Sequence, residues 1–66
     1  MELKDKNYLD VYIGADVEVP TPTEEDDWYF EFVGTIVIID KEEGYVVVED
    51  ADGFHYTVEV ERVEII

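Results

Sequence analysis

An acidic run followed directly by aromatic residues is the part of this sequence best suited to chemistry. The candidate partner-binding residues are Glu24, Glu25, Asp26, Asp27, Trp28 and Tyr29. Carboxylates attract cations, and aromatic faces hold cations through cation–π contacts, so the run predicts a site for a basic or methylated peptide. The alternative is a solvated acidic loop beside core aromatics, because aromatic side chains at strand spacing usually point inward.

Two other patterns resemble metal sites, but each lacks ligands. Residues 50–53, Asp-Ala-Asp-Gly, have the spacing of part of a calcium loop, yet Val48 then takes the first ligand position, where a carboxylate is needed. His55 is the only histidine and cysteine is absent, so the usual zinc ligands are missing. We therefore expect no metal site and no cofactor, with weak association of divalent ions at residues 24–27 as an open alternative.

The residue inventory argues against an enzyme. Serine and cysteine, the commonest nucleophiles, are both absent. A chain of 66 residues is also too small to enclose a pocket of roughly 300 Å³, the lower end for substrate sites. With 19 acidic residues, some carboxylates must lie close together by chance, so proximity alone nominates no general acid or base.

The charge balance restricts the possible partners. Four Lys and Arg residues against 19 Asp and Glu residues give a formal net charge of −15. Direct binding to nucleic acid or to an anionic membrane depends on clustered cations, so we expect neither. The charge instead leaves two alternatives to peptide binding. The protein could be an acidic mimic of nucleic acid, with outward acids such as Glu49 and Glu59 in the place of phosphates. It could also be a ligand-free scaffold whose acidic residues serve only solubility.

Length and composition predict one small, compact domain that spans residues 1–66. A hydrophobic content of 47% argues against a disordered acidic tail. Residues 1–7 contain no apolar stretch typical of a secretion signal, and no segment approaches the roughly 18 apolar residues of a membrane span, so we expect a cytoplasmic protein. Charge repulsion favours a monomer. Serine and glutamine are both missing, and this small set of polar residue types leaves a designed origin open.

Alternation of apolar and polar residues predicts strands throughout the chain. In residues 54–61, Phe54, Tyr56, Val58 and Val60 fall on one face. Residues 45–49 form a second run, and Gly53 suits the turn between them. Residues 14–19 predict a short strand with inward valines at positions 17 and 19.

A longer strand is predicted over residues 28–39. Trp28, Phe30 and Phe32 alternate there until Gly34, which predicts a bulge or bend. Residues 40–44 predict a turn, and residues 20–27 a loop because they hold two prolines and four acids. A one-turn 3₁₀ helix at residues 61–62 would precede a last strand at 63–66. Residues 1–11 fit a strand, a helix or a tail equally well.

This order of elements resembles the SH3-like barrels, which include the Tudor and KOW-type modules. The resemblance covers residues 12–66 and is carried by the segments Val-Glu-Val-Pro at 17–20, Phe-Val-Gly-Thr-Ile at 32–36 with Trp28, Val-Glu-Asp-Ala-Asp-Gly at 48–53 and Val-Glu-Val-Glu-Arg-Val at 58–63. It implies a small five-stranded all-β barrel, most like small acidic bacterial proteins of this type. The Tudor-like modules further imply a cage for a methylated cation, with Trp28, Tyr45, Phe54 and Tyr56 as its members.

The sequence lacks the motifs of polyproline-binding SH3 domains, which carry an Ala-Leu-Tyr-type motif and paired tryptophans. We therefore expect a non-enzymatic interaction module that binds a basic protein or peptide. The environment of Trp28 separates this hypothesis from its rivals, because an exposed ring favours a binding face and a buried ring favours a scaffold or a charge mimic.

The net charge generates a first prediction, which concerns stability and salt. Repulsion among carboxylates destabilises the compact state, and added salt screens it because the Debye length falls from about 30 Å at 0.01 M to about 10 Å at 0.1 M. Urea unfolding is the suitable assay because urea is uncharged. We expect the urea midpoint to rise with sodium chloride between these concentrations, and a constant or falling midpoint would contradict the prediction.

Overall fold

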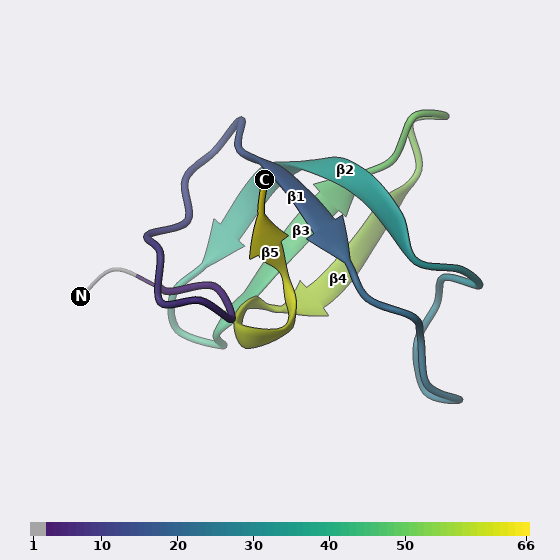
Figure 1. Cartoon of the computed structure of the whole chain (residues 1–66), viewed down its shortest axis with the longest axis horizontal. Coiled ribbons are helices and arrows are strands. Elements are labelled where there is room, and N and C mark those ends of the chain that lie inside the picture. The colour runs from purple at the N-terminus through teal and green to yellow at the C-terminus, as the bar shows by residue number, and fades with distance from the viewer. Residues whose placement is uncertain (1–2) are drawn as a thin grey trace.

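The computed structural model describes residues 3–66 and contains one antiparallel sheet of five strands (Figure 1). The strands are β1 (Asp16–Val19), β2 (Phe32–Asp40), β3 (Tyr45–Glu49), β4 (His55–Glu59) and β5 (Glu64–Ile65), and a 3₁₀ turn, η1 (Val60–Arg62), precedes β5. Their order in the sheet is β4-β3-β2-β1-β5. The prediction of an all-β chain of five strands with a 3₁₀ turn before the last is confirmed.

The sheet is not closed by hydrogen bonds into a barrel. Strands β4 and β5 each pair with one neighbour only, so they form its two edges within residues 3–66. Strand β2 changes partner along its length, because residues 32–35 pair with β1 and residues 35–40 pair with β3. The ribbon of β2 accordingly curves across the molecule (Figure 1).

The core consists mainly of β-branched side chains on the inward face of the sheet. Val17 and Val19 are fully buried, as the alternation in residues 14–19 predicted. The remaining buried apolar residues are Val11, Ala15, Trp28, Ile36, Val46, Val48, Val58, Val60 and Val63. Branched residues suit this position because they pack well on a pleated surface.

The predicted strand over residues 28–39 begins too early. Strand β2 starts only at Phe32, and residues 28–31 form no ladder. Trp28 is buried, but Phe30 is 80% exposed, so the alternation in this segment does not place both rings in the core. Likewise, β4 starts at His55 and Phe54 is exposed, whereas we expected Phe54 to point inward.

Gly34 is required by close packing rather than by a bulge. A Cβ atom at this position would lie 2.5 Å from the carbonyl oxygen of Glu49 and 2.6 Å from Cγ1 of Val48, so no larger residue fits. The shift in register lies further along β2, between Ile36 and Ile38. The bulge predicted at Gly34 is therefore found around residue 37.

The predicted turns are present on both sides of β3. Gly44 and Gly53 have positive φ angles of 78° and 86°, which the absence of a Cβ permits. The carboxylate of Asp40 accepts hydrogen bonds from the N–H groups of Glu42 and Glu43 and so fixes the first turn. Within residues 3–66, no helix is long and apolar enough to cross a membrane.

Residues 3–11, the N-terminal segment, form neither a regular strand nor a helix. This settles the choice between strand, helix and tail for these residues, while residues 1 and 2 lie outside the described part of the chain. Lys4 and Asp10 form an isolated β-bridge and an ion pair. Asp5 is buried, with 3% of its surface exposed. Its carboxylate accepts hydrogen bonds from the N–H groups of Asn7 at 2.8 Å and Leu9 at 2.9 Å, and from that of Ile65 at 2.8 Å.

Asp5 therefore ties the first residues to the last strand. Burial acts to raise the pKa of this carboxyl group, but the hydrogen bonds from Ile65, Leu9 and Asn7 outweigh it and hold the pKa below its ordinary value. The N–H of Lys6 also donates to the carbonyl of Val63 at 3.0 Å. Both contacts lie on the outer side of β5, so the segment covers this edge.

The lowered pKa of Asp5 generates a prediction about pH. A group whose pKa is lower in the folded state stabilises the fold above its unfolded pKa, about 3.9 for Asp, and this stabilisation is lost as pH falls through the folded value. We expect Asp5→Asn to lose about 1–3 kcal/mol of unfolding free energy at pH 7, because it weakens bonds to buried donors. The difference from the parent should shrink as pH falls below 4.

Urea unfolding of both proteins between pH 2.5 and 7 measures this difference. Asp10→Asn is the control, since Asp10 lies in the same segment but is exposed. An Asp5→Asn effect no larger than that of the control at pH 7, or one that is constant with pH, would show that the charged carboxylate does not anchor the segment.

Candidate functional site

The acidic loop, defined here as residues 20–27, runs from the end of β1 and leads into Trp28. Trp28 is only 3% exposed, and its indole N–H donates a hydrogen bond to the carbonyl of Pro20 at 2.8 Å. This bond closes the base of the loop across eight residues. The next two residues point outward, with Tyr29 86% and Phe30 80% exposed.

Arg62 of η1 fixes the acidic loop from the other side. Its guanidinium forms a two-pronged contact with Asp26, in which Nη1 lies 3.1 Å from Oδ1 and Nη2 lies 2.9 Å from Oδ2. Nη1 also donates to Glu59 at 3.1 Å. On the loop, the N–H and hydroxyl of Thr23 donate to the same carboxylate of Asp26 at 2.8 and 3.1 Å. We call Arg62, with Asp26, Glu59 and Trp28, the Arg62 clamp.

Arg62 also stacks on the tryptophan. Its Cζ atom lies 5.3 Å from the centroid of the Trp28 ring, within the range of a cation–π contact. The hydrogen bonds from Arg62, then those from Thr23, hold the pKa of Asp26 far below its usual range, and the contacts with Asp26 and Glu59 raise the pKa of Arg62. Both shifts favour the charged forms of Asp26 and Arg62, which the two-pronged contact requires.

The six candidate partner-binding residues do not form one uniform surface. Asp26 is held by Arg62, and Trp28 is buried. The remaining four, Glu24, Glu25, Asp27 and Tyr29, are exposed on the loop and just after it. The structure thus divides the acidic run into residues that hold the loop and residues that face solvent.

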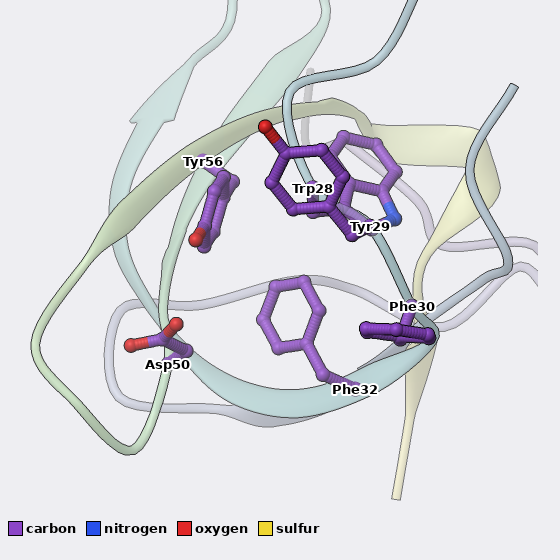
Figure 2. A pocket seen from close by; sticks show the side chains of 6 residues that line it. All are labelled: Trp28, Tyr29, Phe30, Phe32, Asp50 and Tyr56. Atoms are coloured by element: carbon purple, nitrogen blue, oxygen red, sulfur yellow. The ribbon is translucent and has the colours of Figure 1, made fainter. Parts of the chain in front are cut away.

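A hollow of about 160 Å³ lies beside the loop (Figure 2). We call it the aromatic hollow, and its lining residues are Trp28, Tyr29, Phe30, Phe32, Asp50 and Tyr56. The residues come from the segment before β2, the start of β2, the turn after β3 and the strand β4. At this point β2 pairs with β1 alone, so the β3–β4 turn diverges from it and leaves the hollow between them.

Three rings make a rigid wall of the hollow. Phe32 and Tyr56 meet edge-to-face with centroids 5.4 Å apart, and Trp28 contacts each of them in the same way at 6.5 and 6.4 Å. Edge-to-face contact is a favoured geometry for aromatic pairs. Tyr29 and Phe30 add exposed rings at the rim, so the wall is fixed while the rim faces water.

Asp50 supplies a carboxylate to this apolar surface. Its Oδ1 accepts hydrogen bonds from the N–H groups of Asp52 and Phe54, both at 2.9 Å, so the turn holds the side chain in place. Burial, together with the negative charges of Asp50 and Asp52, raises the pKa of the Tyr56 hydroxyl. Asp50 and Asp52 therefore contribute a negative potential at the Tyr56 side of the hollow.

The distribution of cations strengthens this potential. Residues 20–31 contain five acids, residues 49–53 contain three, and neither segment contains Lys or Arg. Of the cations, Arg62 is matched by two carboxylates and Lys4 and Lys6 lie in the N-terminal segment, paired with Asp10 and Glu64. Lys41 lies in the β2–β3 turn, at the opposite end of β3 from Asp50.

The cage implied by the family resemblance is only half present. Trp28 and Tyr56 line the hollow, but Tyr45 and Phe54 do not. Phe30 and Phe32 lie outside the six candidate residues, although the contact face expected from the sequence spans residues 24–32, and Asp50 was considered as a calcium ligand. The sequence feature that could have indicated Asp50 as a site residue is its position in the turn directly before the strand that carries Tyr56.

The two weak metal patterns serve local structure. The Asp50–Gly53 turn uses the Asp50 carboxylate to bind its own N–H groups. Nε2 of His55 lies 3.0 Å from Oε2 of Glu49 on the neighbouring strand. In the described part of the chain, no group of three or more His, Asp or Glu side chains is placed to hold a metal ion.

The Arg62 clamp generates a prediction about stability. Asp26→Asn keeps the shape of the side chain but removes its charge, so Arg62 loses the two-pronged contact that orients the loop. We expect the melting temperature to fall by several degrees and the Trp28 emission to shift to longer wavelength as water reaches the ring. Glu61→Gln is the matched control because Glu61 is an exposed acid in η1; equal effects of the two variants would contradict the prediction.

No family model matches this chain, and no curated protein matches it. The structure shows a small all-β chain with a five-stranded antiparallel sheet.

Proposed function

We propose that this chain is a non-enzymatic binding module that holds a basic protein or peptide on the aromatic hollow and the adjoining acidic loop. The observation that carries the proposal is the hollow itself, in which five aromatic side chains and one carboxylate meet and two of the rings are at least 80% exposed. Exposed large rings next to unpaired acids are unusual on a surface that serves only solubility.

The mechanism has two steps. The acids at this end of the molecule, Glu24, Glu25 and Asp27 among them, attract a positively charged partner over a distance and raise its rate of association. The partner then covers Tyr29 and Phe30, and burial of these rings gives the short-range part of the affinity. The rigid wall behind them limits the ordering that binding requires.

We further propose that the five strands form an SH3-like barrel of the partly open kind. The order of the elements supports this, with a long loop between the first two strands and a 3₁₀ turn before the last. The partner exchange along β2 also supports it, because one strand then contributes to two parts of a curved sheet.

A ligand-free scaffold is the second candidate function, and one observation favours it. Trp28 is buried, which is the outcome expected of a scaffold or a charge mimic. The binding proposal instead assigns the exposed contacts to Tyr29 and Phe30, and gives Trp28 the part of a supporting wall.

A residue-resolved NMR titration with a short peptide rich in Lys and Arg tests the proposal. We expect shifts that saturate, survive physiological salt and cluster on residues 24–32, Asp50 and Tyr56. Uniform shifts that disappear with salt would favour the scaffold or the mimic.

Two matched sets of variants sharpen this test. Neutralising Glu24, Glu25 and Asp27 should weaken binding severalfold, whereas neutralising Glu42, Glu43 and Glu61 should have a smaller effect because these exposed acids lie outside the hollow and the loop. Asp26 is left intact in both sets because it holds the loop. Equal losses in the two sets would indicate binding by net charge alone.

A further inference from the structure

We infer that the aromatic hollow takes the side chain of one arginine of the basic partner, in preference to lysine. This inference rests on the proposed function and names the group that the same site recognises. It follows from the size of the hollow, the geometry of its rings, the placement of its carboxylate and a matching contact elsewhere in this chain.

The volume restricts the occupant to a single side chain. At about 160 Å³, the hollow is well below the roughly 300–1,000 Å³ of sites for small molecules and cofactors. Its lining is aromatic apart from Asp50, so the occupant must present apolar surface and a positive charge together.

The shape of the cation then discriminates between arginine and lysine. A guanidinium is planar and weakly hydrated, so its faces can lie against rings while its N–H groups point outward in the plane. An ammonium group is strongly hydrated in all directions and would lose water against the walls. The aromatic hollow offers rings on several sides and a single carboxylate at its edge, which suits a cation with apolar faces and a polar rim (Figure 2).

Asp50 lies where the rim of such a cation would meet it. The turn holds Asp50 through two N–H groups, and the Tyr56 hydroxyl also hydrogen-bonds to its carboxylate, so the position of this acceptor is fixed before a partner arrives. Tyr29 and Phe30 lie on the solvent side, where they can close over the aliphatic part of the arginine. The wall of the hollow is therefore preorganised for the guanidinium, and the exposed rings of Tyr29 and Phe30 can adapt to the rest of the arginine side chain.

The chain already contains this arrangement once. Arg62 stacks on Trp28 at 5.3 Å and places its in-plane N–H groups on Asp26 and Glu59. Arg62 does not line the hollow, so it approaches Trp28 from outside it. The aromatic hollow repeats the same elements, a ring wall with a carboxylate at its edge, but leaves the position of the guanidinium to a partner.

Three peptides that differ at one central position test the inference. The central residue is arginine, lysine or citrulline, the uncharged isostere of arginine, and the flanking lysines are identical. We expect the arginine peptide to bind about threefold to fivefold more tightly than the lysine peptide, the range that cation–π contacts give at partly exposed sites, and the citrulline peptide to bind most weakly. Binding is followed by NMR shifts of Phe32, Asp50 and Tyr56.

Variants at the rim locate the preference. Tyr29→Ala and Phe30→Ala should remove the advantage of arginine while the protein stays folded, because both side chains are exposed. Phe54→Ala is the matched control, since Phe54 is an exposed ring that does not line the hollow.

The outcomes separate the inference from the proposed function. Equal binding of the arginine and lysine peptides at residues 24–32 overturns the preference for arginine and leaves the binding module in place. An arginine preference that survives both rim variants also overturns the inference, because the discrimination then lies elsewhere. Absence of saturable binding by any of the three peptides overturns both.

Discussion

The contact between Arg62 and Asp26 is the constraint on which the rest of this surface depends. Residues 20–31 form a long connection that belongs to no strand and carries five acids with no cation of its own. Such a segment repels itself and would extend into water. Arg62 supplies the missing charge from η1, and the same guanidinium covers the Trp28 ring. Without this contact, the Trp28 ring would lose the cation on its face and the loop would lose its tie to η1.

The clamp also explains how one segment combines rigidity with exposure. The Trp28 side chain is held by Pro20 through its indole N–H and by Arg62 on its ring, and this anchors the chain at residue 28. Tyr29 and Phe30 follow directly, and the chain must run outward before it enters β2 at Phe32. Their exposure is therefore a consequence of how Trp28 is anchored. Exposed rings on a fixed backbone lose less freedom on binding than rings on a mobile loop, and this lowers the cost of association.

The strands could be predicted from the sequence wherever local pattern and tertiary structure agree. Residues 45–49 form β3 as predicted, because a β-branched run between two glycine turns has few alternatives. The segment before β2 could not be predicted, because its conformation depends on Arg62, which is 36 residues from Asp26 along the chain. Asp5 was missed for the same reason, since the N–H of Ile65 lies 60 residues away. Alternation of apolar and polar residues indicates which face of a strand each residue would occupy. It does not indicate whether a contact with a residue far along the chain holds the segment in another conformation.

The two edges of the sheet show how an open sheet is kept from pairing with another chain. Strand β5 has only two residues, and the N-terminal segment covers its outer side through the Asp5 carboxylate and the Lys6 N–H. The Asp5 carboxylate takes the place of a neighbouring strand, because it accepts the hydrogen bond from the outward N–H of Ile65. Within residues 3–66, no segment pairs with the outer side of strand β4. His55, Thr57 and Glu59 are exposed along it in a chain of net charge −15. Charged edge residues and mutual repulsion discourage strand addition by a second copy. A basic partner would not meet that repulsion, so the charge that discourages pairing between copies of this chain agrees with the basic partner that we propose for the hollow.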